Sequence, residues 1–311
     1  MPQDAIIPDT HGATFCADHS RAMGEDLAGR GGFPERKILI RWPKAAWRYS
    51  RFAAEGMPQD LLDAIDRVQD AGWNVSLIDR KGEPDARHTV LLMPDRLAFH
   101  LATGDLPGFV DAVPRGLSVM ERFSPRSMEP RTVLVCTHGK HDRCCAKFGF
   151  ATYKALATEA ARRGDFCVWE ASHLGGCRFA STVATLPSRR KYGRVAPADA
   201  PDFLSAEAED RPYVPCFRGS AQFDVAAQTA EVLTLRAIAP EHPHAVAQIA
   251  ELEGPASARR FLVEVAGHCA EVICRPERSY AYNACTDLAD NVPHAGFDAW
   301  HGELLSLEAL P

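Results

Sequence analysis

Two short segments of the chain gather residue types that bind soft metals. Residues 136–145 read Cys-Thr-His-Gly-Lys-His-Asp-Arg-Cys-Cys, and residues 173–177 read His-Leu-Gly-Gly-Cys. Thiolate and imidazole groups are the donors that hold zinc ions and iron–sulfur clusters in proteins. We therefore expect one metal centre that takes donors from both segments.

The elements around the two segments explain how they meet. One predicted strand ends at Cys136, and another ends two residues before His173. Cys145 stands just before a predicted helix, whose N-terminal dipole favours a thiolate. The two glycines between His173 and Cys177 let the backbone turn sharply beside a bound group. Because loops that follow the first and second strands of such a unit lie at one sheet edge, donors from both loops can converge.

The same order of elements is predicted twice. The first run has strand 37–42, helix 58–71, strands 73–78, 89–93 and 96–101, and helix 106–113. The second has strand 131–136, helix 148–163, strands 166–171, 178–185 and 191–195, and helix 198–209. Helical crossovers followed by a hairpin indicate mixed sheets, and this order is that of a thioredoxin-like fold. The expected fold class is α/β, with two thioredoxin-like mixed-sheet units (a pseudo-repeat in element order) and a C-terminal extension.

These runs suggest three parts. Residues 1–125 form an N-terminal thioredoxin-like domain without metal ligands, in which residues 1–35 are an irregular lead-in. Residues 126–220 form the domain that carries the metal centre. Residues 221–311 form an extension packed on the second domain, with a helix at 224–238 and short apolar runs at 261–265 and 271–274.

Composition limits the class of protein. The net charge of −6 gives no reason to expect nucleic acid, and no apolar run approaches the roughly 20 residues that span a bilayer. The first residues lack the pattern of a secretory signal, so we expect a cytoplasmic protein without membrane contact. In that compartment the ten cysteines favour metal ligation or redox chemistry over disulfides.

Cysteines outside the two segments have simpler interpretations. The scattered ones are expected to be buried small hydrophobic residues: Cys16, Cys167 and Cys216. Towards the C-terminus, His268 and Cys269 with Cys274 and Cys285 allow a second thiol or metal site. We favour ordinary strand cysteines there, and sequence alone assigns no role to Cys269, Cys274 or Cys285.

The two segments resemble the sucrase/ferredoxin-like family, which is similar to the thioredoxin-like [2Fe–2S] ferredoxins. The shared patterns are Cys-Thr-His-Gly-x-x-Asp-x-Cys-Cys at 136–145 and Ser-His-x-Gly-Gly-x-Arg-Phe-Ala at 172–180. The resemblance runs from about residue 12 to 235. It implies a [2Fe–2S] cluster held by Cys136, Cys145, His173 and the residue at 177, with Cys144 as the alternative ligand to Cys145. Some members have histidine at that last position, whereas this chain has Cys177 and so a Cys3His set.

The function that follows is a ferredoxin-like protein for one-electron transfer or redox sensing, more an electron carrier than a stand-alone enzyme. One histidine ligand would couple electron gain to proton gain, so the potential should fall as pH rises. One alternative is a zinc-stabilised Cys3His binding module, because the same donors fit Zn²⁺. Another is an enzyme with its substrate site between the domains.

Residues near the donors add three expectations. His138 and His141 are expected to be loop residues rather than ligands, and Asp142 either holds the loop by hydrogen bonds or is solvated. The redox partner protein is unknown. A basic run after the second segment (Arg178, Arg189, Arg190, Lys191 and Arg194) either docks an acidic partner or raises the reduction potential, or is an ordinary solvated hairpin.

Overall fold

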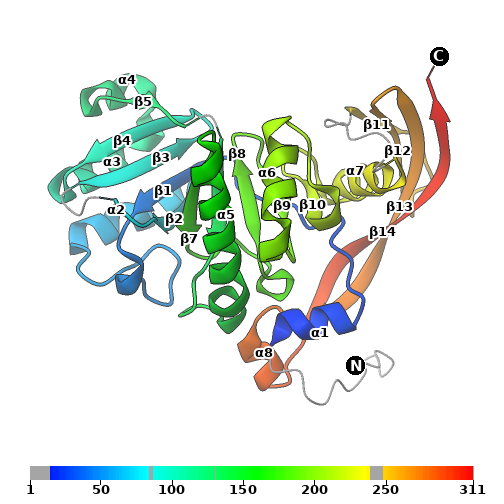
Figure 1. The fold of residues 1–311 in the computed structure, drawn as a ribbon, viewed down its shortest axis with the longest axis horizontal. Helices are drawn as coiled ribbons and strands as arrows, with labels where there is room; N and C mark the ends of the chain where they lie inside the picture. Colours follow the sequence, from blue (N-terminus) through cyan, green and yellow to red (C-terminus); the bar gives the residue numbers. More distant parts are fainter. Residues whose placement is uncertain (1–14, 84–86, 130, 239–247, 311) are drawn as a thin grey trace.

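A ten-stranded mixed sheet passes through both predicted α/β units, in the order β10-β9-β8-β6-β7-β2-β1-β3-β4-β5 (Figure 1). The computed structural model describes residues 15–83, 87–129, 131–238 and 248–310. Within these ranges no helix is both long enough and apolar enough to cross a membrane.

The first half of the sheet follows the predicted order of elements. It contains β1 (Lys37–Arg41), α2 (Gln59–Asp70), β2 (Asn74–Asp79), β3 (His88–Met93), β4 (Leu97–Leu101) and α3 (Leu106–Ala112), followed by α4 (Leu117–Met120) and the edge strand β5 (Arg126–Ser127). β1 pairs parallel with β2 and antiparallel with β3. Helix α2 forms because Leu61, Ile65 and Val68 recur at helical spacing and bury one face against the sheet.

The second half repeats this strand order. It contains β6 (Thr132–Cys136), α5 (Phe150–Arg163), β7 (Cys167–Ala171), β8 (Val183–Leu186), β9 (Arg190–Tyr192), α6 (Ala200–Ala208) and β10 (Phe217–Ser220). β6 pairs parallel with β7 and antiparallel with β8, as β1 does with β2 and β3. The predicted fold class, a mixed α/β protein with two such units, is confirmed. A pseudo-repeat and the three domain boundaries stay predictions.

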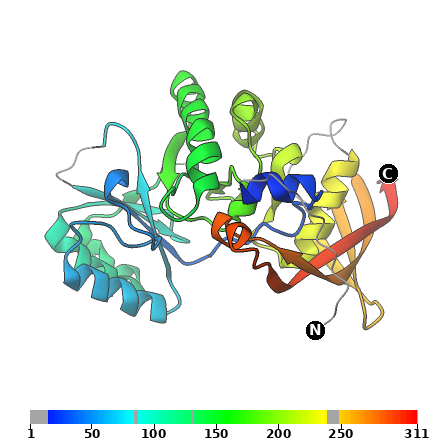
Figure 2. The ribbon, with the colours of Figure 1, turned by 90° about the horizontal axis from the view of Figure 1, so that it is seen from below.

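The two halves join where β2 and β7 run antiparallel for two residue pairs, Ile78 with Ala171 and Asp79 with Glu170. These pairs lie at the carboxyl ends of both strands, so the loops that follow the strands of each half meet at the centre of the sheet. Figure 2 shows the helix pairs α2–α3 and α5–α6 as separate layers on either side of this junction.

Side chains along β6 alternate between two environments. Val133 and Val135 pack against the helices of their own half. Leu134 and Cys136 point to the other face, where they share a buried cluster with Leu39 of β1. The pleat of β6 therefore places the Cys136 thiol on the face opposite α5 and α6.

The ends of the chain differ from the sequence expectation. The irregular lead-in contains a helix, α1 (Cys16–Ala22). After α7 (Val225–Ile238) the chain forms a four-stranded antiparallel sheet instead of two short runs: β11 (Gln248–Leu252), β12 (Arg259–Val265), β13 (His268–Ala281) and β14 (His294–Ala309). The long β13–β14 hairpin carries α8 (Cys285–Ala289) at its tip and returns it to the side of α1 (Figures 1 and 2).

Candidate metal centre

The four predicted donors lie in one chain of contacts at the junction of the sheet halves. The sulfur atoms of Cys136 and Cys145 are 3.3 Å apart, and those of Cys145 and Cys177 are 3.8 Å apart. Cys177 Sγ lies 3.5 Å from Nδ1 of His173. The three thiols are buried and none forms a disulfide, whereas His173 is half-buried.

Close backbone packing brings Cys145 up to Cys136. Cys136 ends β6, and Cys145 opens a π-helical turn, Cys145–Gly149, that leads into α5. A Cβ atom on Gly149 would lie 2.0 Å from the carbonyl oxygen of Cys136. Only glycine therefore allows this turn to pack so tightly against the end of the strand.

The loop His173–Cys177 turns as its two glycines predict. Gly175 has a φ of 86° and Gly176 a φ of 80°, a region that other residues rarely adopt. A Cβ on Gly176 would also lie 2.7 Å from the Arg218 guanidinium. This turn returns the chain so that Cys177 faces the other donors.

Cys144 points away from this group although it adjoins Cys145. Its sulfur lies 3.4 Å from that of Cys16 and 3.2 Å from that of Cys285. The structure thus brings Cys145 together with Cys136 and Cys177, and places the alternative ligand elsewhere.

Neighbouring histidines hold the loops in place. His138 Nε2 donates to the carbonyl oxygen of Arg48 at 2.6 Å, and its Nδ1 accepts the backbone N–H of His173 at 3.4 Å. With both ring nitrogens engaged, His138 is a loop residue, as expected. His141 donates from Nδ1 to the Tyr49 carbonyl at 3.3 Å, and its ring lies 4.0 Å from that of His173.

Buried cations surround the second ligand loop. Lys191 donates from Nζ to the carbonyl oxygens of Leu174 at 2.7 Å and Gly32 at 2.8 Å. Arg218 donates to the carbonyl of Gly175 at 3.4 Å. Neither cation has an ion pair with a carboxylate among the described residues, and both side chains are 4 % exposed. Two basic side chains are thus buried beside thiols that can become anionic, and burial holds the pKa of Lys191 well below the usual range of a lysine.

The predicted basic edge is not a solvated surface. Arg178 is buried and donates to Glu25 at 2.7 Å. Arg190 is buried against Glu207 and Asp210, and Lys191 is held by the carbonyls described above. The interpretation of these three residues as an exposed docking edge or a solvated hairpin is wrong, because all three side chains are buried and donate to partners inside the molecule.

Protonation at the site reflects crowding and burial. Burial lowers the pKa of His173 to about 3, so its imidazole is neutral near pH 7, the form that binds metals. Contact with Cys136 raises the pKa of Cys145 well above the usual range of a thiol. Adjacent thiols resist joint ionisation unless a cation neutralises them.

These donors fit a metal or metal cluster. Three buried thiols and a neutral imidazole converge, and beside them lie two buried basic side chains, Lys191 and Arg218, that form no ion pair with a described carboxylate. Of the six buried side-chain polar atoms that lack a hydrogen-bond partner in the described part of the chain, two belong to residues of this site: Oγ1 of Thr137, next to Cys136, and Nε of Arg218. Free thiols alone leave these groups unmatched, whereas an anionic metal–sulfur group supplies acceptors and negative charge.

Access to the site comes from the side of His173. A pocket of ≈ 560 Å³ is lined by His173 and Cys177 together with His141, Lys191 and Arg218. Cys136 and Cys145 lie behind it. A partner or solvent therefore reaches the histidine side of the site first.

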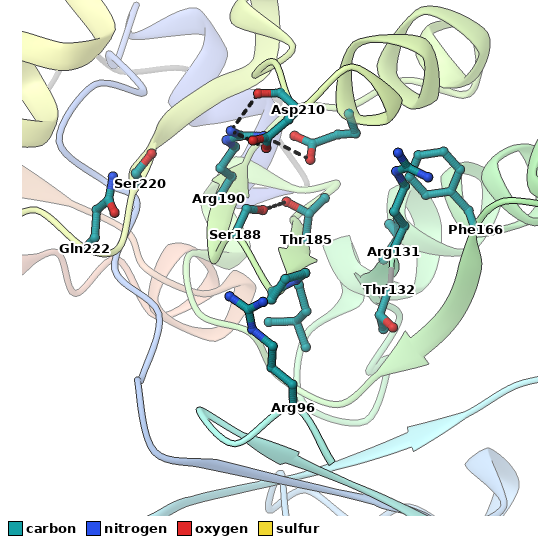
Figure 3. A pocket seen from close by; sticks show the side chains of 14 residues that line it. Arg96, Arg131, Thr132, Phe166, Thr185, Ser188, Arg190, Asp210, Ser220 and Gln222 are labelled. Carbon is teal, nitrogen blue, oxygen red and sulfur yellow. Dashed lines mark hydrogen bonds and ion pairs between the residues drawn. The ribbon is translucent and has the colours of Figure 1, made fainter. Parts of the chain in front are cut away.

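Another pocket, of ≈ 490 Å³, lies at the opposite end of β6 (Figure 3). Thr132 and Val133 line it, and Arg190 reaches Asp210 at 2.8 Å there. No cysteine or histidine is among its lining residues. It is thus separate from the donors.

The sequence missed a second group of thiols. Cys16 was expected to be a buried hydrophobic residue, and it is buried, but its sulfur contacts those of Cys144 and Cys285. Cys16 and Cys144 are 128 residues apart in the sequence, and Cys144 and Cys285 are 141 residues apart, so no local spacing reveals these contacts. His268, Cys269 and Cys274 do not join this group: Cys274 instead contacts the carbonyl of Ala226.

Comparison with known proteins gives one family and a set of solved structures. The model of the family described as Sucrase/ferredoxin-like matches residues 27–219, more than half of the chain. No curated protein matches. A structure of a thioredoxin-like [2Fe-2S] ferredoxin from Aquifex aeolicus matches at 16 % identity over 30 % of this chain and 93 % of that chain, with a TM-score of 0.27. A crystal structure of the wild-type thioredoxin-like [2Fe-2S] ferredoxin from the same organism matches at 17 % identity over 29 % and 96 %, with a TM-score of 0.26.

Proposed function

The chain belongs to the sucrase/ferredoxin-like family, and from this membership and the donor geometry we propose that it binds a [2Fe–2S] cluster and carries single electrons. The observation that carries the proposal is the arrangement of the donors as two pairs. Cys136 and Cys145 form one pair, 3.3 Å apart, and His173 and Cys177 form the other, 3.5 Å apart. A [2Fe–2S] cluster takes two protein ligands on each iron.

Each donor has a defined task in this proposal. Cys136, Cys145 and Cys177 supply thiolates, and His173 supplies a neutral imidazole. The bound group accepts and releases one electron. Compared with four thiolates, this set carries one negative charge less, which raises the reduction potential because an added electron is repelled less.

The surrounding residues support the same task. Lys191 and Arg218 place positive charge beside the thiolates and hold the carbonyls of the ligand loop. Both effects favour an anionic group there, and buried positive charge also raises its reduction potential. The pocket in front of His173 brings the site close to the surface, where a redox partner protein docks. A potential that falls with rising pH stays a prediction, which voltammetry between about pH 6 and 9 tests.

The test is a visible spectrum of the purified full chain with iron and sulfide assays. We expect a red-brown protein with about two irons and two sulfides per chain. Cys136→Ser should lose most of the colour and iron. Cys167→Ser is the matched control, because Cys167 is a buried thiol of the adjacent strand whose sulfur contacts Arg80 rather than the donors.

Two outcomes would contradict the proposal. A colourless protein that loses one equivalent of zinc on Cys136→Ser would identify a zinc-stabilised module instead. Equal loss of iron in Cys136→Ser and Cys167→Ser would show that the colour depends on folding rather than on this donor set.

A further inference from the structure

Three buried thiols and a buried carboxylate meet beside the proposed cluster site. They are Cys16 of α1, Asp142 and Cys144 of the first ligand loop, and Cys285 of α8. One ligand atom from each lies within 4.8 Å of all the others. Helices α1 and α8, which come from opposite ends of the chain, lie side by side here (Figures 1 and 2).

The thiols form a nearly even triangle. The sulfur of Cys144 lies 3.4 Å from that of Cys16 and 3.2 Å from that of Cys285, and the third side, from Cys285 to Cys16, is 3.7 Å. A tetrahedral Zn²⁺ site with zinc–sulfur bonds of 2.3 Å requires sulfur atoms about 3.8 Å apart. Small outward movements of the side chains thus give zinc geometry.

Asp142 caps one edge of the triangle. Its Oδ1 lies 3.3 Å from the sulfur of Cys285, and tetrahedral zinc requires about 3.5 Å between a sulfur and a carboxylate oxygen. The carboxylate also accepts the backbone N–H groups of Cys144 at 2.7 Å and Cys285 at 2.8 Å. These bonds orient the carboxylate and both cysteine backbones before any ion binds.

The charge at this position calls for a cation. Asp142 is 4 % exposed, and among the described residues no basic side chain forms an ion pair with it. Ordinary hydrophobic packing of cysteines would not place a carboxylate among three sulfur atoms, because burying a carboxylate without a cation is costly.

We propose that Cys16, Cys144, Cys285 and Asp142 bind one Zn²⁺ ion in a closed, tetrahedral Cys3Asp site that shares no ligand with the [2Fe–2S] donors but adjoins them, since Asp142 also lies within 4.8 Å of Cys145 and Cys177. All four ligands are buried and come from three segments, so no position is open for a substrate, as in structural zinc sites. The ion ties α1 and α8 to the loop 136–145. Because Cys144 adjoins Cys145, the same loop then carries one ligand to each site.

The test is metal analysis of the full chain, expressed with zinc in the medium. We expect about one zinc per chain in the native protein. Cys16→Ser and Cys285→Ser should each lose at least about nine-tenths of that zinc while iron and sulfide change little, because neither residue contacts Cys136, Cys145 or Cys177. Cys269→Ser, at a half-buried thiol on β13, is the matched control and should keep its zinc.

X-ray absorption at the zinc edge is measured on the native protein, so its result does not depend on whether a variant folds. It should show three sulfur neighbours at about 2.3 Å and one oxygen at about 2.0 Å. The proposal is overturned by zinc-free protein that binds no added Zn²⁺, by iron at these ligands, or by a disulfide between any two of the three cysteines. If the native protein is colourless but holds zinc at these four ligands, the result counts against the [2Fe–2S] proposal alone.

Discussion

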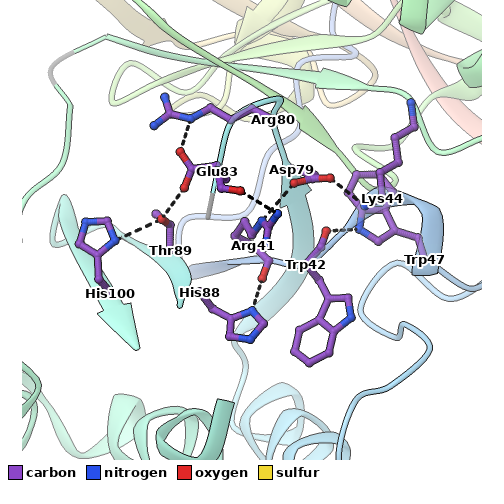
Figure 4. Close-up of polar contacts among 10 residues, drawn as sticks. All are labelled: Arg41, Trp42, Lys44, Trp47, Asp79, Arg80, Glu83, His88, Thr89 and His100. Atoms are coloured by element: carbon purple, nitrogen blue, oxygen red, sulfur yellow. Dashed lines mark hydrogen bonds and ion pairs between the residues drawn. The ribbon is translucent and has the colours of Figure 1, made fainter. Parts of the chain in front are cut away.

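The two halves of the sheet share a strand order but end in different chemistry. In the first half, the carboxyl ends of β1 and β2 carry Arg41 and Asp79, whose side chains form an ion pair at 3.1 Å (Figure 4). In the second half, Cys136 occupies the matching end of β6, and His173 follows β7. In both halves the last residue of the first strand points to the face away from the helices.

The first half satisfies its charges internally. Asp79 also accepts the backbone N–H of Lys44 at 2.8 Å, and Glu83 accepts from Arg80 at 2.6 Å and from Thr89 at 3.1 Å. Each of these carboxylates thus has a cation and a further donor. In the second half, Lys191 and Arg218 have no carboxylate partner among the residues that the structure describes, while thiols converge beside them. The shared fold fixes the position of the sheet edge. The side chains at that edge decide whether they pair with one another, as in the first half, or offer donors to a metal, as in the second.

The first half nevertheless helps to build the second site. The loop after β1 supplies the carbonyls of Arg48 and Tyr49 that hold His138 and His141, and the carbonyl of Arg51 accepts the hydroxyl of Ser172. Lys44 pairs with Glu170 of β7 across the junction. The antiparallel meeting of β2 and β7 makes these contacts possible.

The largest contrast between the halves is expected for glycine-to-alanine substitutions. Gly149→Ala puts a methyl group 2.0 Å from the Cys136 carbonyl, so we expect a loss of stability of about 3 kcal/mol or more and loss of bound iron. Gly108→Ala in α3 of the first half meets no atom within 4 Å and should gain roughly 0.5–1 kcal/mol. Urea unfolding and iron content measure both. Native stability with full iron in Gly149→Ala would show that the turn relaxes freely.

The contrast between local and distant partners also decides what the sequence can reveal. The sequence predicts Cys136, His173 and Cys177 as donors because each lies in a short segment beside a strand end, and strand ends follow from hydrophobic patterns; the structure brings their side chains together. Cys16 and Cys285 were not recognised as partners, since the contact between them and Cys144 depends on how both chain ends fold back.

Burial of charge was equally hidden from the sequence. Arg178 and Lys191 belong to a run that looks like surface, yet tertiary partners bury them. The C-terminal sheet was underestimated because β14 carries exposed leucines at 304, 305 and 307, which blur the alternation that marks a half-buried strand.

A smaller effect is expected from the Arg41–Asp79 ion pair, which lies in the first half where the second half has the candidate metal donors. Asp79→Asn removes the charge that faces the buried Arg41, which should cost roughly 2–3 kcal/mol of unfolding free energy. Iron content should remain native, because Asp79 contacts none of the four donors. Denaturant unfolding with an iron assay checks both. Iron loss in a variant of native stability would mean that the strand ends of the first half and the donors of the second are coupled more tightly than their contacts indicate.

The smallest expected effect concerns a buried cation of the first half, Lys37. Its Nζ donates to Asn74 at 2.5 Å and Ser76 at 2.9 Å, and burial, with a smaller contribution from Arg51, lowers its pKa to about 7. Between pH 7 and the ordinary lysine pKa near 10.4, the unfolded chain binds more protons than the folded one, so this residue makes stability rise with pH.

Lys37→Met should remove that contribution. Its unfolding free energy, measured in urea between pH 7.5 and 9.5, should rise less steeply than that of the native protein by up to about 1.4 kcal/mol per pH unit. Titrations common to both proteins cancel in the difference. Parallel curves would mean that Lys37 keeps its proton when folded. The first half would then hold a charged, buried lysine whose partners among the described residues are uncharged, and the contrast between the halves would rest on the thiols alone.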